Sequence, residues 1–114
     1  MIKIYHNPRC RKSREGLAIV EASGNDFEII NYLKDVPGKK ELRKVLDYLS
    51  LSPEQLIRKN EAIWKEKFKG KTLSDDQLIE AMLENPKLIE RPIVIKGDKA
   101  VIGRPPEKII ELLK

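Results

Sequence analysis

The sequence predicts an α/β fold, a small mixed β-sheet flanked by helices with a helical insertion in the middle of the chain. Three observations lead to this prediction. Residues 3–32 have the pattern strand, helix, strand; residues 92–114 have the pattern of a hairpin and a helix; and the segment between them carries mainly helix signals. Since 114 residues suffice for one domain but not for two, we expect a single domain over 1–114, with the insertion at roughly 38–85.

The N-terminal third is predicted to be a parallel strand–helix–strand unit. Residues 3–6 alternate in polarity and are followed by an Asn-Pro turn. A helix is expected from about residue 11 to residue 23, because Gly24 provides a stop signal. Residues 27–32 read as the second strand. The connection should be a right-handed crossover.

The central segment is predicted to be helical. Its first helix is indicated by apolar residues at helical spacing, namely Leu42, Val45, Leu46 and Leu49. Ser52 and Ser74 each begin a capping box, which predicts helices running to about Lys59 and about Asn85. The second of these helices should bury Leu78, Ile79, Met82 and Leu83. Residues 60–72 are Lys-rich and give no clear prediction.

The C-terminal segment is predicted to be a β-hairpin followed by a helix. Residues 92–96 and 100–102 flank a Gly97-Asp98 turn. Two prolines open the last helix, whose inward residues are expected to be Ile109, Ile110, Leu112 and Leu113. Without the insertion, the element order is βαβ followed by ββα, which is the order of a thioredoxin-like fold.

Composition and charge exclude several classes of protein. Charged residues make up 36% of the chain and hydrophobic residues 40%, as in soluble globular proteins. No apolar run approaches the length of a membrane helix and no secretion signal is visible, so we expect no membrane partner. The net charge of +5 is spread among interspersed acidic residues, and aromatic residues are only 5% of the chain. We therefore do not expect a nucleic-acid partner.

Cys10 is the only cysteine and His6 the only histidine. No intrachain disulfide can form, and we expect no bound metal and no bound cofactor. A single thiol fits a reducing compartment, so we expect a cytoplasmic location.

Cys10 lies where the first helix should begin, just after the first strand. Unpaired N–H groups at a helix N-terminus stabilise a thiolate and can cradle an anion. Four cationic residues also lie close to it in sequence, namely Arg9, Arg11, Lys12 and Arg14. These features predict a thiol with a lowered pKa. A buried, inert cysteine is the alternative, which the flanking arginines disfavour because they are costly to bury.

Two neighbours could assist Cys10. His6 could orient or stabilise the thiolate, or it could be a strand-end histidine bonded to backbone groups. Ser13 could donate a hydrogen bond to the sulfur or could simply sit on the helix surface. Because Ser13 stands where a dithiol protein has its second cysteine, an oxidised Cys10 must be resolved by an external thiol.

The segment Tyr5–Arg14, YHNPRCRKSR, resembles the signature of the glutaredoxin-coupled arsenate reductase family of the ArsC type, which has a thioredoxin fold. The resemblance extends over nearly the whole chain, through the segments 56–60, 75–79, 85–94 and 103–107. It implies a thiol-dependent oxidoreductase in which the Cys10 thiolate attacks arsenate or a related oxyanion. Glutathione is then the co-substrate, and glutaredoxin is the partner that regenerates the thiol.

The resemblance also implies the roles of individual residues. Cys10 is the nucleophile, His6 assists it, and Ser13 and Arg14 help to form the anion loop. The oxyanion is bound by three arginines from distant positions, Arg58, Arg91 and Arg104. Arginine suits this task because its guanidinium stays charged and grips oxyanions with paired N–H groups.

Two further positions have expectations from the resemblance. Pro92 is a candidate cis-proline beside the active cysteine. Arg11-Lys12 stands where well-defined arsenate reductases carry Gly-Thr, which indicates a subgroup with Cys-Arg-Lys-Ser. These two cations either crowd the anion loop or enlarge its positive field.

A function of another class is the alternative. Spx-like regulators share this fold, bind RNA polymerase and use a CxxC switch. This chain lacks the second cysteine, so the alternative is a non-catalytic interaction role without a dithiol switch.

Overall fold

The computed structural model describes all residues, Met1–Lys114, and the chain divides into two compact units. The first comprises Met1–Asp35 and Arg91–Lys114, and the second comprises Val36–Glu90. No helix is long and apolar enough to cross a membrane. The expectation of a single domain over 1–114 with an insertion at roughly 38–85 stays a prediction.

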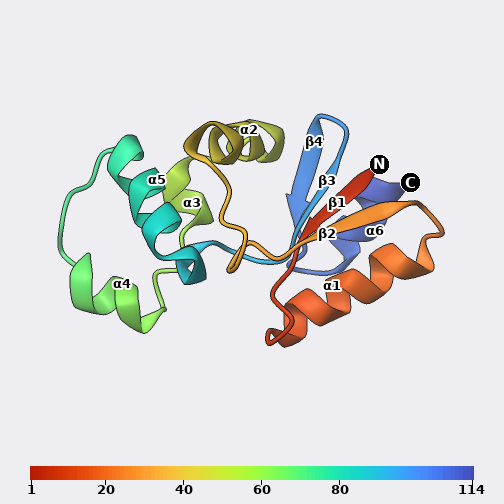
Figure 1. Cartoon of the computed structure of the whole chain (residues 1–114), viewed down its shortest axis with the longest axis horizontal. Helices are drawn as coiled ribbons and strands as arrows, with labels where there is room; N and C mark the ends of the chain where they lie inside the picture. The colour runs from red at the N-terminus through yellow and green to blue at the C-terminus, as the bar shows by residue number, and fades with distance from the viewer. The chain divides into compact units, whose positions relative to one another are not determined.

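The first unit contains a four-stranded mixed sheet in the order β2-β1-β3-β4 (Figure 1). Its strands are β1 (Ile2–Tyr5), β2 (Phe27–Ile30), β3 (Ile93–Lys96) and β4 (Lys99–Ile102). β1 pairs in parallel with β2 and antiparallel with β3, and β3 forms the expected antiparallel hairpin with β4. The predicted small mixed sheet flanked by helices, with the thioredoxin-like element order, is confirmed.

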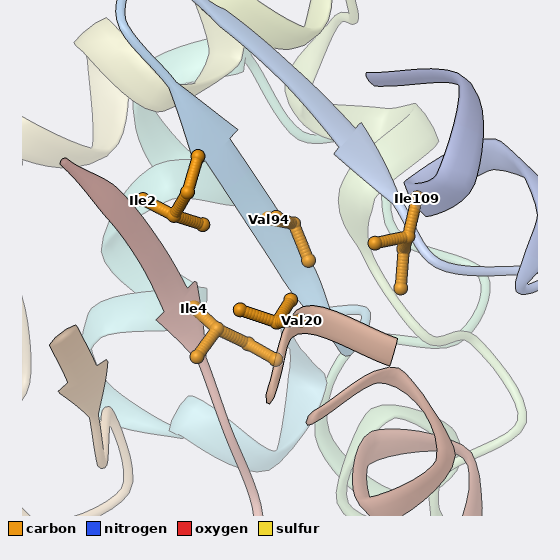
Figure 2. Packing of buried hydrophobic residues seen from close by; sticks show 5 residues of the cluster. All are labelled: Ile2, Ile4, Val20, Val94 and Ile109. Carbon is orange, nitrogen blue, oxygen red and sulfur yellow. The ribbon is translucent and has the colours of Figure 1, made fainter. Parts of the chain in front are cut away.

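Two helices, α1 (Arg11–Ala22) and α6 (Glu107–Leu113), bury one face of this sheet. The core brings together apolar side chains from β1, β3, α1 and α6, as Figure 2 shows for Ile2, Ile4, Val20, Val94 and Ile109. The prediction that Ile110 faces inward is wrong, because its side chain is 47% exposed. Consecutive helical residues point about 100° apart, so α6 can direct Ile109 into the core only by turning Ile110 outward.

The second unit is helical. It contains α2 (Lys39–Leu49), α3 (Pro53–Leu56), α4 (Ala62–Lys67), α5 (Asp75–Glu84) and the 3₁₀ helix η1 (Pro86–Leu88). The capping boxes predicted at Ser52 and Ser74 are both present. α3 ends before the predicted Lys59, because Ile57 is extended and forms a β-bridge with Ile89. Leu83 is only partly buried, whereas the other three predicted core residues of α5 are buried.

Two glycines in the first unit are required by close packing. A Cβ added to Gly103 would lie 2.6 Å from Cδ1 of Ile109 and 2.9 Å from Cγ of Pro92. A Cβ added to Gly16 of α1 would lie 2.7 Å from the same Pro92 atom. Gly16 and Gly103 therefore leave just enough room for the Pro92 and Ile109 side chains, and this packing fixes the segment that enters β3.

We expect Gly103→Ala to lower the free energy of unfolding by about 1–3 kcal/mol, the usual cost of an overpacked core. Urea denaturation measures the change. Gly38→Ala is the matched control, because an added Cβ meets nothing within 4 Å at Gly38 and its φ is −74°. An equal loss in both variants would show that the Gly103 packing is not the cause.

Candidate active site

Cys10 begins α1 at the end of a tight turn. Its N–H donates to the carbonyl oxygen of Asn7 (3.0 Å), and its own carbonyl accepts the N–H of Arg14 (3.0 Å), which is the first hydrogen bond of the helix. Cys10 is the N-cap residue, in extended conformation, and is partly buried. Cys10 thus lies at the N-terminus of α1 and is not fully buried.

Two arginines approach the sulfur from the other end of the sequence. Nη2 of Arg104 lies 3.7 Å from Sγ of Cys10, and the side chain of Arg91 also donates a hydrogen bond to the sulfur. All three residues belong to the first unit. The structure therefore brings together the predicted nucleophile and two of the three predicted oxyanion-binding arginines.

The backbone before β3 and after β4 holds these arginines together. The carbonyl of Pro92 accepts the N–H of Gly103 (2.8 Å), and the carbonyl of Arg91 accepts Nε–H of Arg104 (2.8 Å). The Arg91–Pro92 peptide bond is cis, as expected for Pro92, and the Arg104–Pro105 bond is cis as well. One guanidinium thus contacts both the sulfur and the backbone carbonyl of the second arginine.

The environment lowers the pKa of the Cys10 thiol. Partial burial raises the pKa, but the hydrogen bond and the positive charge of Arg91, together with the backbone N–H groups of Ser13 and Lys12, outweigh it. The predicted lowering is therefore supported, although Arg91 contributes to it more than the cations adjacent to Cys10 in sequence. The thiolate, which is the reactive form, is favoured.

His6 and Ser13 are buried and bonded to each other. Nδ1 of His6 lies 2.7 Å from Oγ of Ser13, and the same hydroxyl accepts the N–H of Asn7 (2.9 Å). Burial is the largest of the causes that lower the pKa of His6, and the charge of Arg14 adds to it. The lowered pKa favours the neutral form of His6. Its ring contacts the hydroxyl of Ser13 and not the sulfur, and its role as an assisting residue stays a prediction.

The other predicted site residues have separate surroundings. Arg14 is exposed, and its Nη1 donates to the carbonyl of Pro8 (3.0 Å). Arg58 belongs to the second unit, where its guanidinium pairs with Glu90 (3.3 Å) and Glu61 (3.5 Å). A common oxyanion site that includes Arg58 stays a prediction.

The cations within and just before the Cys-x-x-Ser segment are turned toward solvent. Arg11 pairs with Glu15 (3.3 Å), and Lys12 lies 3.9 Å from the same carboxylate. Arg9 is exposed. The structure contains no group of three or more His, Cys, Asp and Glu side chains that could hold a metal ion.

Sequence reasoning missed two residues that shape the site. Gly103 allows the close packing on Pro92 described above, and Asn7 is a buried residue at the start of the loop that carries Cys10. The Asn-Pro turn signal could have indicated Asn7. The need for glycine at residue 103 is visible only once the two strands and α6 are folded together.

Comparisons with known proteins agree on one family. The ArsC family model matches residues 5–112. The chain is 43% identical to an arsenate reductase of Haemophilus influenzae, over 96% of this chain and 97% of that protein, and 45% identical to the uncharacterised protein YfgD of Escherichia coli, over 98% and 96%. A solved arsenate reductase from Vibrio cholerae superposes with a TM-score of 0.92 at 46% identity, covering 96% of this chain and 95% of that one.

Replacing Arg91 should raise the pKa of Cys10. Because the guanidinium favours the charged form of the sulfur, Arg91→Ala should move the titration upward and Arg91→Lys should move it less. Thiolate absorbance as a function of pH measures the change. Arg9→Ala is the comparison variant, and a titration that shifts equally in Arg9→Ala and Arg91→Ala would contradict the assignment.

The lowered pKa of His6 predicts a loss of stability in mild acid. Below the ordinary value of 6.5, the unfolded chain binds a proton that the folded His6 resists, so the free energy of unfolding should fall as the pH drops from about 7.5 to about 5.5. Urea denaturation of Cys10→Ser at both pH values, with and without His6→Gln, isolates this effect, because the chain has no other histidine. Equal pH dependence in the two variants would contradict the prediction.

Proposed function

This chain belongs to the ArsC family, and we propose that it reduces arsenate with electrons from glutathione and glutaredoxin. The coarser activity, that of an arsenate reductase-like, thiol-dependent enzyme, follows from the family. The observation that carries the proposal is a partly exposed thiol with a lowered pKa, located at a helix N-terminus with two arginines on its sulfur. We expect the protein to act in the cytoplasm, where thiols are kept reduced.

The first step is attack by the thiolate. The Cys10 sulfur forms a bond to arsenic, and an arsenate oxygen takes up protons and leaves as water. Glutathione then attacks the adduct, and pentavalent arsenic accepts two electrons as the sulfurs of Cys10 and glutathione join in a mixed disulfide. Trivalent arsenic leaves as arsenite. Because the chain has no second cysteine, a glutaredoxin thiol must reduce this disulfide and release Cys10.

The arginines suit the charges of this reaction. Arg91 and Arg104 lie at the sulfur, so they can hold an arsenate oxygen while the sulfur–arsenic bond forms. We assign Arg58 to the same task, which requires it to exchange part of its pairing with Glu61 and Glu90 for the oxyanion. Arg14 and the N–H groups at the start of α1 complete the anion loop.

His6 and Ser13 have a supporting role in this proposal. Their contact couples the end of β1 to the first turn of α1, which keeps the Cys10 loop in place during attack. The Arg11-Lys12 pair is turned toward Glu15 and solvent. This orientation favours an enlarged positive field over crowding of the loop, with part of the charge offset by the Glu15 carboxylate.

The test is arsenate-dependent consumption of NADPH in the presence of glutathione, glutaredoxin and glutathione reductase. Cys10→Ser should abolish turnover. Arg104→Lys should lower kcat/KM about a hundredfold, as expected when a positioned donor to the developing charge is lost. Arg43→Lys, at an exposed arginine that pairs with Asp76, is the matched control and should leave kcat/KM unchanged.

Turnover no greater than that of Cys10→Ser would refute arsenate reduction. The RNA polymerase interaction is then the remaining alternative, and it makes a different prediction. A role without redox chemistry does not need the sulfur, so Cys10→Ser should still recover polymerase subunits from a cell extract.

A further inference from the structure

Asn7 joins the end of β1 to the start of α1 through three hydrogen bonds. Its side-chain Oδ1 accepts the N–H of Arg9 (3.0 Å), its carbonyl accepts the N–H of Cys10 (3.0 Å), and its own N–H donates to Oγ of Ser13 (2.9 Å). The residue is only 7% exposed. One of these bonds is made by the side chain and the other two by the main chain. A buried side chain whose oxygen accepts a loop N–H has a specific structural task.

These bonds define the shape of the loop that delivers Cys10. Asn7 to Cys10 form a four-residue turn with proline in second position, the arrangement that proline's fixed φ favours. Pro8 has no N–H, so the N–H of Arg9 is the first donor inside the turn, and the Asn7 carboxamide satisfies it. The turn thereby places Cys10 at the N-cap of α1.

We propose that Asn7 is a positioning residue that holds the Cys10 sulfur where Arg91 and the first N–H groups of α1 stabilise its negative charge. These interactions depend steeply on distance and direction. The contact from Arg104 is already 3.7 Å long, so a modest displacement of the turn would lose it. The main-chain N–H of residue 7 ties the turn to α1 through Ser13, and the Asn7 side chain adds the bond to the Arg9 N–H inside the turn.

This inference rests on the proposed thiolate chemistry, but its readout does not require turnover. The rate of alkylation of the only thiol by iodoacetamide, a neutral reagent, reports the thiolate fraction at each pH. In Asn7→Ala the midpoint of the rate–pH profile should rise, and the rate at neutral pH should fall about threefold to tenfold. Asn7→Ser, whose hydroxyl can accept the Arg9 N–H, should recover at least half of the lost rate.

The control is Asn25→Ala. Asn25 also makes a turn hydrogen bond, to Oγ of Ser23 (3.1 Å), but it lies beyond the opposite end of α1 and is exposed. If Asn7→Ala does not fold, Asn7→Leu removes the acceptor while keeping the branched shape and the number of heavy side-chain atoms. An unchanged midpoint in the folded variant, no recovery in Asn7→Ser, or an equal shift in Asn25→Ala would overturn the proposal. A protein that does not reduce arsenate but still shows the shifted alkylation profile in Asn7→Ala would contradict only the assignment of arsenate as the substrate.

Discussion

The charge on one sulfur depends on a contact between two loops that are far apart in the sequence. Arg104 donates to both the Cys10 sulfur and the main-chain carbonyl of Arg91, so its guanidinium links the loop of Cys10 to the backbone that carries the second arginine. The backbone beneath the two arginines is fixed by the Gly103–Pro92 hydrogen bond and by the tight packing of Gly16 and Gly103. The chemistry at the surface therefore depends on packing in the core.

Partial burial of Cys10 has two opposing effects. It raises the pKa of the thiol, which opposes ionisation, but it also reduces the screening of the arginine charges by water. The pKa is lowered overall, so the attraction to Arg91 and to the helix N–H groups together outweighs the cost of burying the charged sulfur. A more exposed sulfur would interact less strongly with the arginines, and a fully buried one would be closed to substrate.

Much of the architecture could be predicted from the sequence, because its signals are local. The alternation of polarity in β1, the helix stop signal at Gly24 and the two capping boxes each indicate a strand or a helix. The position of Cys10 just after the first strand is enough to place it at the start of a helix. The inward orientation of Ile110 was wrong because consecutive helical residues point about 100° apart, and Ile109 takes the direction that faces the core. The end of α3 was misplaced because a bridge to Ile89 decides it.

The site was less predictable, because its charges converge through tertiary structure. Arg91 and Arg104 could be assigned from the family resemblance but not from spacing, since their approach to Cys10 depends on the hairpin. The bond between His6 and Ser13 depends on the turn that brings residues 6 and 13 together. The sequence shows directly which cations neighbour Cys10, but the side chains of Arg11 and Lys12 turn toward Glu15 and solvent.

Because Cys10 is the only cysteine, the protein is sensitive to oxidative stress. A thiolate activated in this way also reacts with peroxides, forming a sulfenic acid. No second thiol in the chain can capture that acid as a disulfide, so only an external thiol competes with further, irreversible oxidation to the sulfinic acid. The electrostatic field that makes the sulfur reactive also makes it vulnerable whenever the supply of small thiols falls.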